Sequence, residues 1–94
     1  MIRVTFYFSS GNEQSSHDCQ TVQEAFERLQ RTGMQASAHP VGTTSGCYSW
    51  DPSKDHTLEG FKAKLEMCCN DPREYSRRLI DAGICKPWNP YLSR

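Results

Sequence analysis

The first residues of the chain alternate between apolar and polar side chains over positions 2–8. The apolar positions share one face of an extended chain and the polar positions share the other: Ile2, Val4, Phe6 and Phe8 against Arg3, Thr5 and Tyr7. A period of two, carried by β-branched and aromatic residues, is typical of a strand that buries one face. The chain is therefore constrained from its start to build a sheet with an apolar side.

Three further strands are predicted, and the first of them is expected to pair with this strand. Residues 9–12, Ser-Ser-Gly-Asn, have the composition of a tight turn, because glycine and asparagine tolerate positive φ. The polar segment 13–19 follows at hairpin distance, so we expect it to be the partner strand. Weaker alternation over 34–39 and an aromatic run over 47–50 indicate a second hairpin across the loop-like residues 41–46.

The first helix is predicted directly after the first hairpin. Thr21 and Glu24 have the spacing of a capping box, in which the threonine hydroxyl accepts a hydrogen bond from the Glu24 amide and the glutamate reaches back. An apolar stripe follows at helical spacing: Val22, Ala25, Phe26 and Leu29. Gly33 can adopt the left-handed conformation that ends a helix, so we expect a helix over 22–31.

Two more helices are predicted in the C-terminal half. Thr57 precedes the first of them, Asn70 is expected to end it, and its apolar stripe is Leu58, Phe61, Leu65 and Cys68. The sequence Asp71-Pro72-Arg73-Glu74 then has the order of an N-cap, a first-turn proline and a first-turn acid. We expect its inner face to comprise Tyr75, Leu79 and Ala82, with Ile80 beside them and a Schellman motif at Gly83 and Ile84.

The predicted order β-β-α-β-β-α-α favours an α+β fold, a small antiparallel β-sheet of two hairpins with about three helices packed on one face. Ninety-four residues correspond to a single compact domain over 1–94. The segment 84–94 cannot continue a helix, since it contains Pro87 and Pro90. Its aromatic residues, Trp88 and Tyr91, are expected either to pack on the domain or to contact a partner.

The charge balance gives no field that would attract nucleic acid or an anionic membrane. The chain has eleven basic and eleven acidic residues, and its pI is near 6.8. No stretch approaches the ~18 apolar residues of a membrane span, and the first residues lack the pattern of a signal peptide. We therefore expect a cytoplasmic protein without a membrane partner. Five cysteines, two of them adjacent, fit reduced thiols better than disulfides.

Metal and cofactor sites are not predicted. The eight residues that could ligate a metal lack the Cys-x-x-Cys spacing of zinc modules: His17, Cys19, His39, Cys47, His56, Cys68, Cys69 and Cys85. We interpret Cys47, Cys68 and Cys85 as small buried hydrophobic residues. The residues 42–46, Gly-Thr-Thr-Ser-Gly, resemble an anion-binding loop only superficially, and we expect a hairpin connection there.

A thiol-dependent enzyme is the third function that the sequence allows. Cys19 precedes the first helix by two residues and has His17 nearby, so it is the strongest candidate for a nucleophile. No third group that would orient the pair can be identified. We therefore expect no catalytic residue and no enzymatic activity.

Nucleic-acid binding is the second function. Arg73, Arg77 and Arg78 fall on the third predicted helix, with Lys86 and Arg94 beyond it. The aromatic tail could supply stacking surfaces for bases. Acidic residues on the same helix interrupt this basic patch, however, so we expect nucleic-acid binding to be weak.

The leading interpretation is a non-enzymatic interaction protein, namely an adaptor, regulator or inhibitor that binds another protein. Interface centres are rich in tyrosine, tryptophan and arginine, and the end of this chain concentrates such residues: Tyr75, Arg77, Arg78, Trp88 and Tyr91. Small stand-alone domains of this kind occur among accessory proteins of phages and mobile elements, including anti-CRISPR inhibitors. That analogy rests on size and not on shared residues.

Overall fold

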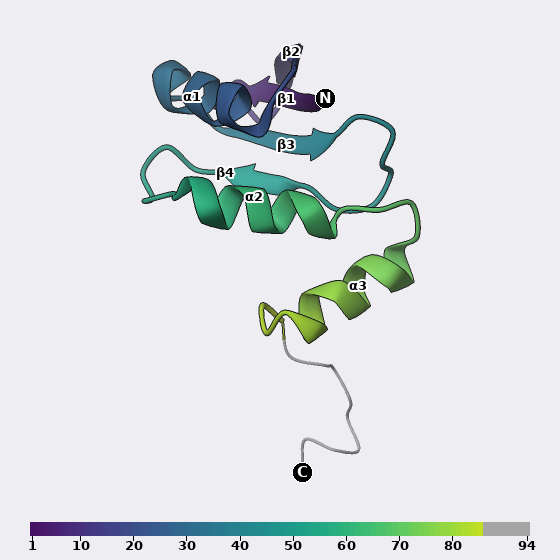
Figure 1. The fold of residues 1–94 in the computed structure, drawn as a ribbon. Coiled ribbons are helices and arrows are strands. Elements are labelled where there is room, and N and C mark those ends of the chain that lie inside the picture. Colours follow the sequence, from purple (N-terminus) through teal and green to yellow (C-terminus); the bar gives the residue numbers. More distant parts are fainter. Residues whose placement is uncertain (86–94) are drawn as a thin grey trace.

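The computed structural model describes residues 1–85 of the chain. The strands are β1 (Ile2–Tyr7), β2 (Glu13–Cys19), β3 (Ala36–Pro40) and β4 (Tyr48–Trp50). The helices are α1 (Val22–Thr32), α2 (Leu58–Met67) and α3 (Pro72–Asp81). The order β-β-α-β-β-α-α confirms the predicted α+β class (Figure 1).

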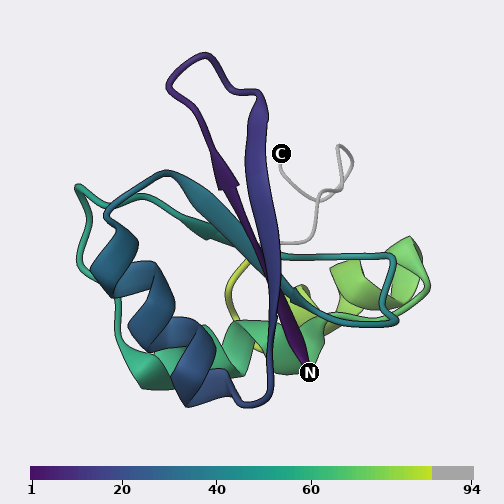
Figure 2. The same cartoon turned by 90° about the horizontal axis from the view of Figure 1, so that it is seen from above.

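The four strands form one antiparallel sheet in the order β2-β1-β3-β4. Both predicted hairpins are present, and β1 lies in the centre between β2 and β3. Seen from above, the turn between β1 and β2 projects beyond the helices (Figure 2). No helix within residues 1–85 is long and apolar enough to cross a membrane.

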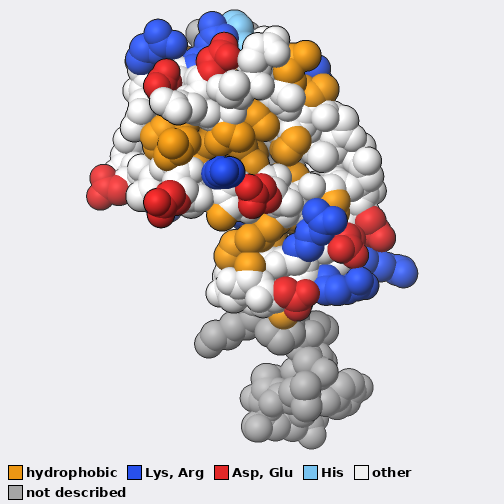
Figure 3. Space-filling view, in the orientation of Figure 1, with side chains coloured by type: hydrophobic (Ala, Val, Ile, Leu, Met, Phe, Trp, Pro, Cys, Tyr) orange, Lys and Arg blue, Asp and Glu red, His pale blue; other side chains and the backbone are white. Residues whose placement is uncertain are grey.

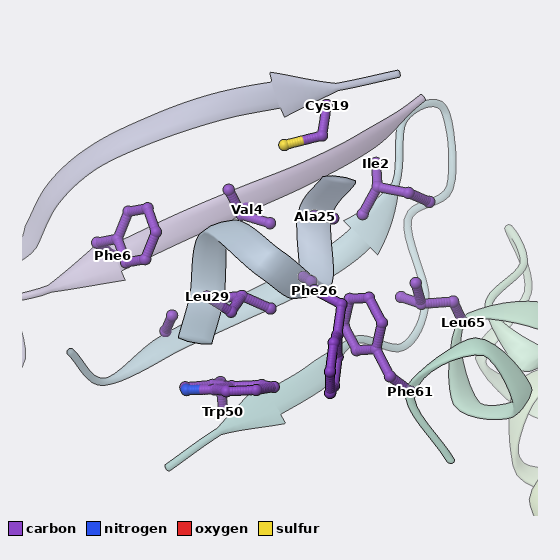
Figure 4. Close-up of a cluster of buried hydrophobic side chains, with 12 residues drawn as sticks. Ile2, Val4, Phe6, Cys19, Ala25, Phe26, Leu29, Trp50, Phe61 and Leu65 are labelled. Atoms are coloured by element: carbon purple, nitrogen blue, oxygen red, sulfur yellow. The ribbon is translucent and has the colours of Figure 1, made fainter. Parts of the chain in front are cut away.

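The apolar face of the sheet and the inner faces of α1 and α2 enclose one hydrophobic core (Figure 4). Phe6, Phe26 and Leu29 all belong to it, which confirms the predicted packing of the first hairpin on α1. The ring of Phe26 lies 5.5 Å from that of Trp50 and 5.6 Å from that of Phe61. Such tilted and edge-on aromatic pairs stabilise a core beyond the area that they bury.

The apolar face of β1 is shorter than the alternation predicts. β1 ends at Tyr7, and Phe8 is 49% exposed. The Phe8 amide donates to the Asn12 carbonyl and the Phe8 carbonyl accepts from the Gly11 amide, so the backbone is already turning at this point. The prediction that Phe8 shares the buried face is therefore wrong.

The predicted caps of α1 are present with one difference. The Thr21 hydroxyl accepts a hydrogen bond of 3.1 Å from the Glu24 amide. The Glu24 carboxylate reaches back to the amide of Gln20, one residue earlier than in a standard capping box. At the other end, Gly33 adopts the left-handed conformation with φ 64°, and the helix extends one residue further than predicted, to Thr32.

The second helix also begins as predicted, because the Thr57 hydroxyl accepts from the Gly60 amide. Of its expected stripe, Phe61, Leu65 and Cys68 are buried, whereas Leu58 is exposed at the first turn. The helix ends at Met67 and not near Asn70, since the backbone of Cys68 is extended with ψ 139°. This extension allows the next residue, Cys69, to form an isolated antiparallel bridge with Ser45.

Candidate protein-binding surface

Capping interactions define both ends of the third helix, α3. The Asp71 carboxylate accepts from the Arg73 amide at 2.9 Å, and the proline occupies the first turn. At its C-terminal end the Gly83 amide donates to Ile80 and the Ile84 amide donates to Leu79, each at 3.0 Å. These are the two hydrogen bonds of the predicted Schellman motif.

The inner face of α3 contacts the molecule through two side chains. Leu79 is buried, and Tyr75 is half-buried with its ring against Gly46 in the loop between β3 and β4. Ala82 is exposed, so its predicted place on the inner face is wrong. The helix ends at Asp81, and Ala82 already belongs to the C-cap.

The outer face of α3 carries a carboxylate held between two guanidinium groups. Glu74 accepts from Arg77 at 3.1 Å and from Arg78 at 3.3 Å. Arg78 also donates to the Glu66 carbonyl of α2 at 3.5 Å, whereas the Arg77 side chain is 68% exposed. Figure 3 shows basic and acidic side chains intermixed over the lower part of the molecule, where α3 lies.

Of the five residues predicted as an interface, the structure therefore brings three together on α3: Tyr75, Arg77 and Arg78. Tyr75 holds the helix against the loop, and the two arginines face outward. Trp88 and Tyr91 lie outside the described residues. We call Glu74, Arg77 and Arg78 the α3 surface.

The loop that superficially resembles an anion-binding site is a hairpin connection fixed to the α2–α3 junction. The Thr44 amide donates to the Asn70 side chain at 2.9 Å. The Ser45 amide donates to the Cys69 carbonyl at 2.8 Å, and the Cys69 amide donates back at 3.1 Å. These amides are occupied within the chain, which supports the connection that the sequence indicates.

Cys19 is fully buried in the core. Of the three cysteines that we interpreted as buried, Cys68 is buried, which confirms the prediction for this residue, whereas Cys47 and Cys85 are exposed, so the prediction is wrong for these two. All five thiols are free, and no group of three metal-ligating side chains gathers within residues 1–85. Burial raises the pKa of the Cys68 thiol, and the nearby thiols of Cys47 and Cys69 act in the same direction.

One cluster of polar and aromatic side chains escaped the sequence analysis. The imidazole of His56 stacks on the indole of Trp50, with ring centroids 4.0 Å apart and planes within 16°. Its Nε2 lies 2.8 Å from the Asp51 carbonyl, and its Nδ1 forms a short hydrogen bond with the Tyr48 hydroxyl. A carbonyl only accepts, so Nε2 carries a proton, and in the neutral ring Tyr48 donates to Nδ1. Burial raises the pKa of Tyr48, which keeps its hydroxyl a donor.

Two open depressions of about 320 and 540 Å³ flank this stack, and Lys54 lines both. The His56 nitrogens are already bonded to the protein, so the cluster fastens the loop before α2. A histidine six residues after an aromatic residue gives no periodic signal, and sequence patterns could not have found it.

No protein-family model, curated protein or solved structure matches this chain.

Proposed function

We propose that this chain is a non-enzymatic protein-binding domain, an adaptor, regulator or inhibitor, which contacts its partner through the α3 surface. The observation that carries this proposal is the position of Glu74 between Arg77 and Arg78. Arginines are enriched at the centres of protein interfaces, where their planar donors bind carboxylates and carbonyl groups.

The carboxylate of Glu74 prepares the two arginines for such contacts. A long side chain that is already held in one arrangement loses less conformational freedom when it binds. A guanidinium has five N–H donors, and Glu74 engages only part of them. The remaining donors suit a partner surface that offers carboxylates and backbone carbonyl groups.

The same carboxylate argues against nucleic acid, the alternative that the sequence left open. Phosphate binding depends on uncompensated positive charge, and each exposed carboxylate in the patch reduces it. On α3, Glu74 offsets the charge of one of the two arginines, and Asp81 lies one helical turn beyond Arg77 and Arg78.

A thiol-dependent enzyme is the weakest alternative. A catalytic thiolate must be accessible to its substrate and lie near a group that lowers its pKa. Cys19, the candidate nucleophile, has no exposed surface and packs among apolar side chains of the core. This burial supports a structural role for Cys19.

The proposal is tested by quantitative capture from a nuclease-treated native lysate. The wild-type protein is compared with Arg77→Ala/Arg78→Ala and with a control of equal charge, Arg31→Ala/Lys62→Ala, whose residues are exposed and lie outside α3. We expect one captured protein that the control retains and the α3 variant loses. Capture that disappears with nuclease treatment, or that both variants retain, contradicts the proposal.

A further inference from the structure

The outer edge of the sheet at β2 is open to solvent along its length. β2 is an edge strand, and within residues 1–85 no other strand lies beside its outer edge. Figure 1 shows β2 at the top of the molecule, on the far side from α2 and α3. Viewed from above, β2 crosses in front of the sheet with no element over it (Figure 2).

The hydrogen bonds of β1 show which backbone groups of β2 point outward. The Tyr7 amide donates to the Gln35 carbonyl at 2.9 Å, on the β3 side. Backbone groups of successive residues point to opposite edges of a strand, so the even-numbered residues of β1 bond to β2. Val4 is one of these, and it lies opposite His17.

The backbone N–H and C=O groups of Ser15, His17 and Cys19 therefore point toward β1. The N–H and C=O groups of Ser16 and Asp18 point to the free edge. Gln14 has no partner in β1, because the register shifts there by one residue and makes it the extra residue of a bulge. Ser16 and Asp18 thus offer unpaired backbone groups to a further strand.

We propose that a second copy of this chain pairs with β2, antiparallel and about a twofold axis through Ser16. Ser16 then lies opposite Ser16 of the second copy, and Gln14 lies opposite its Asp18. Because Ser16 is an outward position, the two Ser16 residues exchange two hydrogen bonds, as opposite residues at such positions do in an antiparallel pair. The two sheets become one continuous sheet across the dimer.

The sequence of β2 fits this pairing. A twofold axis at Ser16 is the register that overlaps all seven residues of β2, Glu13–Cys19. It brings no two side chains of like charge opposite each other: Glu13 faces Cys19, Gln14 faces Asp18, and Ser15 faces His17. The strand also contains neither proline nor lysine, two residues that commonly protect an edge from pairing, and its bulge at Gln14 lies near one end of the strand, away from the axis at Ser16.

The exposed apolar residue at the hairpin turn favours a second copy over an isolated peptide strand. Phe8, at the turn between β1 and β2, is 49% exposed. Antiparallel pairing places the Cys19 end of one β2 next to the Glu13 end of the other. Since α1 follows Cys19, the axis brings α1 of each copy toward the turn that carries Phe8 of the other.

The dimer goes beyond the proposed function and does not depend on it. Because α3 lies far from β2 in the molecule, the dimer carries an α3 surface at each end (Figure 1). A partner that is itself dimeric or repeated would then be bound at two points, which strengthens binding without any new contact.

The test is sedimentation equilibrium of the wild-type protein, Ser16→Pro and the matched control Ser16→Ala. Both variants lose the hydroxyl bonded to Thr5 and Glu13, but only proline also removes the outward N–H. We expect wild type and Ser16→Ala to reach twice the 10.8 kDa of one chain with a dissociation constant on the order of micromolar, and Ser16→Pro to remain monomeric.

A second variant decides the matter if Ser16→Pro does not fold. Ser16→Lys keeps the backbone donor but places two positive charges opposite each other at the axis, and we expect it to be monomeric with an unfolding midpoint close to that of Ser16→Ala. A wild-type protein that stays monomeric up to millimolar concentration overturns the proposal, as does dimerisation of Ser16→Lys equal to wild type. Arg77→Ala/Arg78→Ala should dimerise normally, which separates this test from that of the α3 surface.

Discussion

The ring of Tyr75 occupies the space that a side chain at Gly46 would need. A Cβ atom on Gly46 would lie 2.7 Å from Cδ1 and Cζ of the tyrosine ring, and nearer still to Cε1. Gly46 also has φ +93°, a conformation that other residues rarely adopt. The ring of Tyr75 thus packs α3 closely against the loop between β3 and β4.

Gly46→Ala should therefore destabilise the protein more than a change that causes backbone strain alone. Gly42→Ala is the matched control, since Gly42 has φ +95° with no atom near its would-be Cβ. We expect the control to lower the free energy of unfolding by about 1–2 kcal/mol and Gly46→Ala to lower it further. Equal losses in chemical denaturation would show that Tyr75 does not pack as described.

Phe26→Ala tests the core. Phe26 is buried between Trp50 and Phe61, so its truncation leaves a cavity in the centre of the molecule. We expect a loss of about 3–5 kcal/mol in the free energy of unfolding. Phe8→Ala, at an exposed position, should change it by about 0.5 kcal/mol or less. A near-zero effect of Phe26→Ala at unchanged m-value would mean that α1 is misplaced.

The ion pair between Arg3 and Asp18 predicts a specific acid dependence of stability. The hydrogen bond from the Arg3 guanidinium lowers the pKa of Asp18, with partial desolvation opposing it and the Arg3 charge adding to it. A carboxylate whose pKa is lowered in the folded state stabilises it above the unfolded pKa of about 4, and this contribution is lost as the pH falls through the folded value.

Wild type should therefore exceed Asp18→Asn in unfolding midpoint near neutral pH, and the difference should shrink toward about pH 3. Both side chains are substantially exposed, so the difference should be small and should decrease with salt. Urea denaturation of both proteins across this pH range measures it. A difference that grows on acidification would contradict the sign of the Asp18 pKa shift.

Nucleic-acid binding should be weak and non-specific, with dissociation constants on the order of micromolar or poorer at physiological salt. Glu74→Gln removes the carboxylate between Arg77 and Arg78 and should strengthen this binding, with a steeper salt dependence. Fluorescence anisotropy with labelled DNA and RNA provides the measurement. Nanomolar affinity of the wild type for one defined sequence, weakened by Arg77→Ala, would make nucleic acid the partner.

The elements of the fold were predictable because their signals are local. The Thr21 cap, the Gly33 stop and the Asp71-Pro72 start act through neighbouring backbone groups, and all three occur in the structure as predicted. Alternation and helical spacing in turn indicate which face is buried. The order of strands and helices and the α+β fold class follow from these local signals alone.

Several features depend on segments that are distant in the sequence, and local signals could not predict them. Cys68 leaves the helix because its neighbour pairs with Ser45, which is far away in sequence. Cys19 is buried because the register of β2 places it opposite Ile2, over the core. On α3 the sequence predicted the arginines and the acidic residues among them, and the structure adds the ion pairs that join Glu74 to both Arg77 and Arg78.

The affinity of the α3 surface for the captured protein tests the central claim most directly. Isothermal titration calorimetry of the purified pair should compare wild type, Arg77→Ala/Arg78→Ala and the control Arg31→Ala/Lys62→Ala, with matched unfolding midpoints for all three. We predict that the α3 variant binds more than tenfold more weakly, a loss of about 1.4 kcal/mol or more, while the control stays close to wild type. Equal affinities for wild type and the α3 variant would contradict the account.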